Sequence, residues 1–501
     1  MELRDAESRA GGEEGRARLR GRVVALFADD PGPASALAEA LESAGAQPHL
    51  MPLDAGESAV RMLGHLSREA GGPGAVIFLQ ADAGRDGGGL KTMFHGLKAV
   101  AAARPDVVLV TRQGSGPERH TAPLRGFLRA LRGEWLDCGF RMLDFDPAGD
   151  WAGDARRVVE EWPPGEDWLE VVFRGGRRGT WRPVASVLPP DPGPAPLREG
   201  AVIVATGGLR GITAQAALGL ARACGGRVHA LGRTLPEDGM EGLDGGGDIQ
   251  ELRRRLLEQN RLLGRNETPA SLERQIAGIL KQRALRRTVR AYAAAGVPLA
   301  CHQADVSDAG ALGRALRRIG DEEGRIDAVL HGAGVIEDRL LVQKTEESFD
   351  RVYRTKVAAA LALEQHLPRQ HLQLVALFSS VSAYVGNRGQ TDYAAANAAL
   401  NALAAEWASS WGCRVVALAW GGWEPEEDAP GMVSSAVEER LKRLGVELIG
   451  REVGMRAFLD EVASPGPAHV LLGGGRWEEF LRAGSPARAV SLAGSETGGG
   501  A

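Results

Sequence analysis

The chain has 501 residues, of which 44% are hydrophobic, enough for packed cores in roughly two to four domains. Its 60 basic and 65 acidic side chains give a net charge of −5, which argues against the broad basic surface that binds nucleic acid or anionic lipid. The four cysteines form no Cys-x-x-Cys pair, and no apolar run approaches the roughly 18 residues of a membrane helix. We therefore expect a cytoplasmic protein with no disulfide framework, no structural zinc, no membrane span and no nucleic-acid partner.

The first half of the chain is expected to form a parallel α/β unit. Residues 1–21 are charged and lack an apolar core, which predicts a disordered tail rather than a signal peptide. Residues 22–188 alternate apolar runs, such as RVVALFA and GAVIFLQ, with helical patterns such as ASALAEALESAG. This alternation is typical of a parallel sheet covered by helices. Near its end, Gly175 and Gly176 predict the turn of a β-hairpin.

A second and more regular α/β series follows the proline-rich linker that we place at residues 189–200. This series occupies residues 201–482, and the closing residues 483–501 are small and polar, which predicts another disordered tail. The expected strands lie near residues 201–205, 227–231, 299–303, 327–331, 374–378 and 414–419. The predicted fold class is therefore α/β, with two Rossmann-like units built on parallel sheets.

One segment, residues 247–294, interrupts this rhythm with helical periodicity on both sides of GRNETPAS. We interpret it as an inserted helical hairpin whose second helix begins after an N-cap at Thr268. Its many arginines alternate with leucines at helical spacing, which favours a solvated face over a phosphate-binding patch.

A glycine-rich turn opens the second series. In VIVATGGLRGIT, the glycines come directly after a buried strand and before a helix, where a pyrophosphate can approach free backbone N–H groups. A glycine-rich turn without a ligand is the alternative, and the strand-turn-helix context disfavours it. The next strand ends at Arg233, where a guanidinium suits the 2′-phosphate of NADPH, and Arg210 could assist.

Two further turns are expected against the same cofactor. Asp305 in QADVSD lies at a strand end suited to the adenine, and HGAGV offers a second turn of small residues. The predicted cofactor-binding set is Thr206, Gly207, Gly208, Arg210, Gly211, Ile212, Arg233, Asp305, Val306, Gly332, Ala333 and Gly334. His331, His366 and His371 could suggest a metal. His331 ends a strand in the expected cofactor turn, whereas His366 and His371 flank a helix terminus with no third ligand beside them, so no metal site is predicted.

The helix TDYAAANAAL carries the clearest catalytic pattern. Short-chain dehydrogenases have Tyr-x-x-x-Lys on this helix, whereas here Tyr393 is followed by Asn397. The chain has only six lysines, and one of them, Lys356, lies 24 residues before Ser380, which itself precedes Tyr393 by 13 residues. Such an arrangement resembles the ketoreductase domains of polyketide synthases, in which Lys, Ser, Tyr and Asn act together. The alternative is that Tyr393 packs as an ordinary aromatic residue.

The resemblance extends over about residues 22–480 and includes the motifs LRGFLRALRGEW, GNRGQTDYAAAN and ALAWGGW. It is strongest to ketoreductases of iterative synthases of the polyunsaturated-fatty-acid type. It implies that residues 22–188 form a truncated, structural Rossmann-like subdomain without cofactor; there LFADDPGPAS stands where a binding loop would be. Residues 201–482 would form a doubly wound short-chain-dehydrogenase fold. The sequence departs from the family at Thr213, which replaces the last glycine of the phosphate loop, and in the acidic EPEEDA.

The resemblance also implies an activity, the NADPH-dependent reduction of a β-ketoacyl thioester held by the phosphopantetheine of an acyl carrier protein. Neighbouring synthase domains would be further partners. Tyr393 would donate a proton to the carbonyl oxygen, Ser380 would hydrogen-bond that oxygen, and Lys356 would lower the pKa of the tyrosine. Asn397 would hold Lys356 and a relay water. Alternatives are a silent structural scaffold, or a reductase or epimerase of a free small molecule.

Stereochemistry is implied by HGAGVIEDRLL. Ketoreductases that make the 3R alcohol resemble one another in a Leu-Asp-Asp triplet at this point, and here the triplet is Ile336, Glu337 and Asp338. Ketoreductases of opposite selectivity carry a tryptophan where this chain has Val385. The predicted substrate and stereocontrol residues are Ile336, Glu337, Asp338, Gly389, Gln390 and Met432. The expected product is therefore the (3R)-β-hydroxyacyl thioester.

Overall fold

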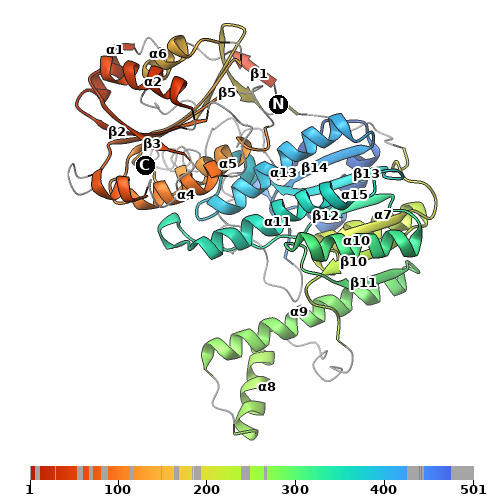
Figure 1. Cartoon of the computed structure of the whole chain (residues 1–501). Helices are drawn as coiled ribbons and strands as arrows, with labels where there is room; N and C mark the ends of the chain where they lie inside the picture. The colour runs from red at the N-terminus through yellow and green to blue at the C-terminus, as the bar shows by residue number, and fades with distance from the viewer. Residues whose placement is uncertain are drawn as a thin grey trace, which may run out of the picture.

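Two separate sheets organise the chain in a computed structural model, and they form two α/β halves that lie side by side (Figure 1). The structure describes residues 2–5, 12–28, 30–53, 60–66, 72–80, 88–112, 118–147, 149–162, 169–182, 184–185, 193–237, 249–264, 268–425, 439, 442 and 445–475. The predicted tail at residues 483–501 and residues 189–192 of the predicted linker lie outside these residues.

The first sheet has eight strands in the order β1-β8-β7-β6-β5-β4-β2-β3. Its strands are β1 Glu2–Asp5, β2 Val23–Ala28, β3 Gln47–Pro52, β4 Ala75–Gln80, β5 Asp106–Arg112, β6 Phe140–Phe145, β7 Glu170–Arg174 and β8 Arg177–Arg182. The strands from β3 to β7 are parallel, and the β7–β8 hairpin turns at Gly175 and Gly176, both at positive φ. Two consecutive positive φ values suit a two-residue hairpin turn, so this prediction is confirmed.

The helices that accompany this sheet include α1 Gly12–Leu19, α2 Pro31–Ser43, α4 Gly88–Ala99, α5 Ala122–Arg132 and α6 Trp151–Glu160, and residues 60–66 are helical as well. At the start of α2, the carboxylate of Asp30 accepts a hydrogen bond from the Gly32 N–H at 2.9 Å. An acidic side chain thus caps the helix that follows β2, where a nucleotide-binding fold would receive a phosphate.

The expectation of a disordered tail at residues 1–21 is wrong. β1 pairs antiparallel with β8 at the edge of the sheet, and α1 ends on the fully buried Leu19. A Cβ at Gly15 would lie 2.5 Å from the carbonyl oxygens of Val159 and Trp162, so the missing side chain lets α1 pack directly on α6. The charged sequence concealed these elements because the sheet edge and α6 provide the order that a short segment lacks alone.

The second sheet is parallel throughout, in the order β11-β10-β9-β12-β13-β14-β16. Its strands are β9 Val202–Thr206, β10 Arg227–Gly232, β11 Leu299–Gln303, β12 Ala328–His331, β13 Leu374–Ser380, β14 Arg414–Trp420 and β16 His469–Leu472; β15 Val446–Glu447 and β17 Gly474–Gly475 pair separately. All six predicted strands are present, and the two Rossmann-like α/β units confirm the fold class. The strand order reverses direction between β9 and β12, and open α/β sheets bind ligands at the carboxyl ends of the strands next to such a reversal.

The helices of this half are α7 Gly211–Cys224, α8 Ile249–Leu262, α9 Pro269–Ala294, α10 Ala309–Glu323, α11 Glu346–His366, α12 Ser382–Val385, α13 Thr391–Ser410 and α15 Arg451–Ala463, with a 3₁₀ turn η2 at Leu341–Gln343. In the described part of the chain, no helix is long and apolar enough to span a membrane.

The two helices expected in residues 247–294 are present, and the side chain of Thr268 caps α9 by accepting from the Ser271 N–H at 3.2 Å. The interpretation of the whole segment as an insertion needs correction. Leu285 and Tyr292 of α9 are buried in the core of the second half, and the Tyr292 hydroxyl donates to the Ala214 carbonyl of α7 at 3.0 Å. The parallel strands β10 and β11 require a crossover helix, and the second part of α9 supplies it.

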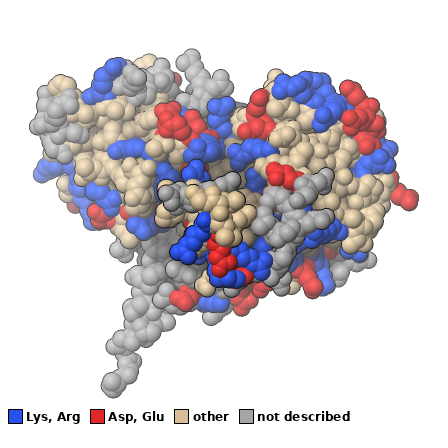
Figure 2. Space-filling model, turned by 90° about the horizontal axis from the view of Figure 1, so that it is seen from below, with Lys and Arg blue, Asp and Glu red and all other residues tan. Residues whose placement is uncertain are grey.

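Only α8 and the first part of α9 project from the body (Figure 1). They bury a small core of their own made of Leu252, Leu256, Leu272, Ile276 and Ile279. Ion pairs such as Arg253 with Glu273 cover their outer surface, and Figure 2 shows basic and acidic side chains intermixed on this side of the molecule. The solvated face predicted for the arginines fits this mixture.

The two halves meet where α5 packs against α13 (Figure 1). A Cβ at Gly126 would lie 2.5 Å from the Ala394 carbonyl oxygen and 2.9 Å from the Ala398 Cβ, so the backbones approach closely here. Arg119 of the first half also forms ion pairs with Glu364 and Glu406 of the second. The helix that carries Tyr393 is therefore supported from the first half.

Candidate active site

The glycine-rich turn lies between β9 and α7, at the reversal of strand order. Gly207 has φ +72°, and a Cβ there would lie 2.9 Å from the backbone of Ala333. Gly211 has φ +65°, and a Cβ there would meet nothing within 4 Å, so the space in front of α7 is open. Arg210, the N-cap of α7, makes no side-chain capping hydrogen bond. An uncapped helix N-terminus facing open space fits a bound phosphate.

The second turn of small residues closes on the first. Thr213 contacts Gly332, where a Cβ would lie 1.9 Å from the threonine Oγ1. A Cβ at Gly334 would lie 3.1 Å from Cε of Lys356. These glycines make room for Thr213 and Lys356, so the departure at Thr213 is accommodated by Gly332.

The other predicted cofactor residues line the carboxyl ends of the same strands. Thr206 and Val306 are buried, Ile212 is half-buried, and Arg233 is exposed just beyond β10. Asp305 accepts hydrogen bonds from the Ser307 N–H at 3.0 Å and the Ser307 hydroxyl at 2.7 Å, which hold the pKa of its carboxyl below the usual range. The structure thus places this set at the carboxyl ends of neighbouring parallel strands.

His331 connects the end of β9 to α11, the helix that carries Lys356, a contact that sequence reasoning missed. Its Nδ1 lies 2.7 Å from the Thr206 hydroxyl, and its Nε2 lies 2.9 Å from the Lys356 carbonyl oxygen. The ring is fully buried, and burial together with the Lys356 charge lowers its pKa to about 4. A neutral imidazole donates from Nε2 to the carbonyl and accepts at Nδ1 from the hydroxyl. Its position at the end of β12 was the only sequence signal.

Lys356 lies on α11 and points into the site. Its ammonium donates to the Phe378 carbonyl at 2.7 Å and lies 5.6 Å from the centre of the Tyr393 ring. Burial lowers its pKa to about 7, so both its charged and its neutral form are accessible near neutral pH. The lysine missing from the helix of Tyr393 is thus supplied by a neighbouring helix.

Tyr393 and Asn397 lie on α13, and both are buried. Burial raises the pKa of Tyr393, and the side chains of Asn397 and Ser380 act in the opposite direction. The Asn397 amide donates to the Tyr393 carbonyl at 2.8 Å, and the Ser379 hydroxyl ties β13 to α13 by donating to the Asn397 carbonyl at 3.1 Å. The structure therefore brings all four predicted catalytic residues together.

The predicted stereocontrol residues separate into two groups. Gln390 donates from Nε2 to the carboxylate of Asp338 at 3.0 and 3.2 Å, and burial raises the pKa of Asp338. Glu337 instead turns toward α11, where it pairs with Arg351 and accepts from the Ser348 hydroxyl. Ile336 is half-buried, Gly389 has φ +84°, and Met432 lies outside the described residues, as does most of EPEEDA. Asp338 and Gln390 therefore form the described contact at this rim.

The first half of the chain also reaches this rim, which the sequence did not predict. Glu134, just after α5, accepts from the Leu341 N–H at 2.7 Å and from the Gly389 N–H at 3.2 Å. Lys98 of α4 donates to the carbonyl of Lys344. One carboxylate thus joins the segment after Asp338 to the segment before Gln390.

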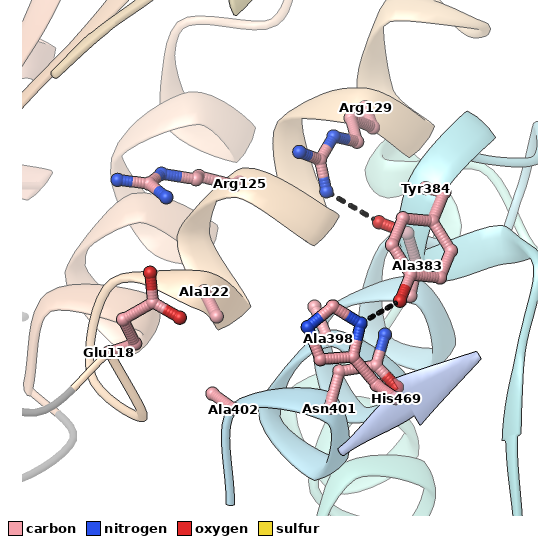
Figure 3. Close-up of a pocket in the computed structure, with 10 residues that line it drawn as sticks. All are labelled: Glu118, Ala122, Arg125, Arg129, Ala383, Tyr384, Ala398, Asn401, Ala402 and His469. Atoms are coloured by element: carbon pink, nitrogen blue, oxygen red, sulfur yellow. Dashed lines mark hydrogen bonds between the residues drawn. The ribbon is translucent and has the colours of Figure 1, made fainter. Parts of the chain in front are cut away.

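A small cavity of about 90 Å³ lies between the halves and is separate from these residues (Figure 3). Its lining includes Arg125 and Arg129 of α5 and Asn401 of α13. Tyr384 and His469 line it as well, and the Tyr384 hydroxyl lies 2.7 Å from His469 Nδ1. None of the four predicted catalytic residues lines it. Among the described residues, no three His, Cys, Asp or Glu side chains gather as metal ligands would.

Comparison with known proteins places this geometry in a family. Residues 200–425 match the family model of the KR domain. The chain is 32% identical over 283 residues to a polyunsaturated fatty acid synthase protein of Thraustochytrium sp. (strain ATCC 26185 / S-3), covering 55% of this chain and 10% of that protein. It is 31% identical over 290 residues to the polyketide synthase ThaG of Burkholderia thailandensis, covering 57% and 4%. The chain contains a ketoreductase domain of the polyketide synthase type.

Solved ketoreductases have the same overall fold. The ketoreductase from the first module of phoslactomycin biosynthesis in Streptomyces sp. HK803 matches with a TM-score of 0.68 at 22% identity, over 98% of this chain and 95% of that one. The first ketoreductase of the tylosin synthase matches with a TM-score of 0.67 at 24% identity, over 94% and 93%. Both α/β halves of the chain thus have counterparts in solved ketoreductases. The chain spans a tenth or less of the length of the two synthases that it resembles in sequence.

Proposed function

We propose that this chain reduces a β-ketoacyl thioester, carried by an acyl carrier protein, to the (3R)-β-hydroxyacyl thioester with NADPH. The observation that carries the proposal is the meeting of Lys356, Ser380, Tyr393 and Asn397 next to an open, glycine-lined helix N-terminus. Bound NADPH would supply the hydride. The large synthases among the relatives support a carrier-bound substrate and neighbouring synthase domains as partners.

The residues of the chain would position the substrate and move the proton. Tyr393 would donate its phenolic proton to the carbonyl oxygen, and Ser380 would hydrogen-bond the same oxygen. A charged Lys356 next to the ring would favour the phenolate that forms. Asn397 would hold the end of α13 that carries Tyr393, and it would also hold the water that relays protons to Lys356.

The cofactor residues around α7 would bind the pyrophosphate, while Arg233 and Arg210 would bind the 2′-phosphate. The first half would bind no nucleotide, because Asp30 caps its α2 with a carboxylate and no glycine-rich turn leads into that helix. This half would act as a structural subdomain.

Two alternatives are less well supported. A silent scaffold would not need a buried lysine beside a buried tyrosine, because burying an ammonium is costly without a function. A reductase or epimerase of a free small molecule would leave unexplained why the first half forms hydrogen bonds with the substrate rim.

The test is an NADPH oxidation assay with a simple β-ketoacyl thioester, followed by chiral chromatography of the alcohol. We expect mainly the 3R product and one NADPH bound per chain in calorimetry. Tyr393→Phe should bind NADPH almost as wild type but turn over at least about a hundredfold more slowly. Wild-type turnover in this variant would remove Tyr393 from the mechanism, and no turnover by the wild-type chain would favour a scaffold.

A further inference from the structure

The crossover helix α9 is fastened to the turn that follows β10, next to Arg233. Gln282, which is buried on α9, donates from Nε2 to the Leu235 carbonyl at 3.2 Å and accepts from the Glu237 N–H at 3.1 Å. The side-chain amide therefore hydrogen-bonds to the turn on both sides of Pro236. Since the second part of α9 is packed in the core, the turn is held against a rigid element.

Lys281 precedes Gln282 and lies against the same turn. Its ammonium donates to the Thr234 hydroxyl at 2.6 Å, which fixes the charge beside the residue that follows Arg233. Lys281 is half-buried, and its pKa is lowered by burial first and then by the positive charges of Arg210 and Arg233. Cations from the N-cap of α7, the end of β10 and α9 therefore lie within electrostatic reach of one another.

Like charges brought together raise the energy of the unliganded site. The Asp305 carboxylate interacts with Arg233 and is hydrogen-bonded to Ser307. A phosphate dianion would neutralise the excess positive charge and accept hydrogen bonds from all three side chains. Helix α7 begins at Gly211, and Arg233 follows 22 residues later, close to the separation of about 20 residues between the pyrophosphate turn and the ribose-binding residue of dinucleotide-binding folds.

We propose that Lys281, carried by the extended helix α9, is a third cationic ligand of the cofactor 2′-phosphate and selects NADPH over NADH together with Arg210 and Arg233. The inference rests on the proposed function, since it names a residue of the same cofactor site. The proposal gives the long helix α9 a role in cofactor choice, which the intermixed charges of its projecting part do not suggest.

The test compares binding of NADPH, NADH and 2′,5′-ADP by fluorescence and calorimetric titration, which needs no substrate. Lys281→Met should weaken NADPH and 2′,5′-ADP by about tenfold or more and leave NADH within about twofold, because only the first two carry the 2′-phosphate. Lys281→Arg should restore most of the preference. Thr234→Val, which keeps the ammonium and removes its hydroxyl partner, should change the preference much less than Lys281→Met.

Arg274→Met is the matched control, because it removes one positive charge from the exposed part of α9 and should leave all three affinities unchanged. Equal loss of NADPH and NADH in Lys281→Met, or no loss, would overturn the inference; melting temperatures show whether the variant folds. A wild-type chain without preference for NADPH would overturn both Lys281 and the proposed cofactor. A wild-type chain that prefers NADPH but reduces no thioester would refute only the proposed reaction.

Discussion

At the scale of single residues, His331 links stability to pH. Its folded pKa is about 4, whereas an unfolded histidine titrates near 6.5, so the unfolded chain binds more protons between these values. Stability from this residue is present above pH 6.5 and is lost as the pH falls toward 4. His331→Gln, which can keep both hydrogen bonds, should remove up to about 3 kcal/mol of this pH dependence. Urea unfolding between pH 4.5 and 7.5 measures it.

The control is His49→Gln, because His49 is exposed on β3 and far from the site in the chain. An unchanged pH slope in His331→Gln would show that the imidazole is not the group that titrates.

Asp338 is the residue on which the predicted stereochemistry depends. Its hydrogen bond with Gln390 joins the segment around Asp338 to the segment just before Tyr393. Asp338→Ala should erode the 3R excess while slowing turnover by less than about tenfold, because the four catalytic residues stay in place. Glu337→Ala is the matched control: Glu337 faces Arg351 on α11, and its loss should leave the product ratio unchanged. Chiral chromatography of both products decides, and equal effects would assign no steering to Asp338.

At the scale of elements, the same substitution is expected to have opposite effects in two helices. Gly126→Ala would drive a methyl group into the backbone of α13 and destabilise the chain by about 1–3 kcal/mol. Because Ala394 follows Tyr393, turnover should fall as well. Gly278→Ala lies on the exposed part of α9, where a Cβ meets nothing within 4 Å, and should stabilise by about 0.5–1 kcal/mol. Denaturant unfolding measures both; destabilisation by Gly278→Ala would mean that α9 is not an ordinary helix there.

At the scale of the whole molecule, the first half is expected to influence the reaction although it carries none of the proposed catalytic residues. Glu134→Gln keeps the size of the side chain but retains one acceptor oxygen, so either the Leu341 or the Gly389 N–H loses its partner. We expect a loss of about 1–3 kcal/mol of stability and a lower 3R excess. Glu160→Gln, on the exposed surface of α6, is the control. A wild-type product ratio in Glu134→Gln would confine the first half to a supporting role.

Much of the second half could be predicted because the relevant signals are local. Buried strands and a glycine turn before a helix are properties of short stretches, and the spacing of Lys356, Ser380 and Tyr393 is recognised by its resemblance to ketoreductases. The parallel α/β fold and the ketoreductase family are confirmed, and the structure brings the four expected side chains together. Their catalytic roles stay predictions.

Contacts between distant segments could not be read in this way. β1 and α1 are ordered by a sheet edge and by α6, and the second part of α9 is a crossover helix because β10 and β11 are parallel neighbours. Glu134 reaches the rim, and Lys281 reaches Arg233, only once the chain has folded. Sequence by itself determined the periodic elements, which depend on neighbouring residues, and the catalytic spacing, which is recognised by its resemblance to ketoreductases. Tertiary structure decided which charges meet, because packing brings together residues that are far apart in the chain.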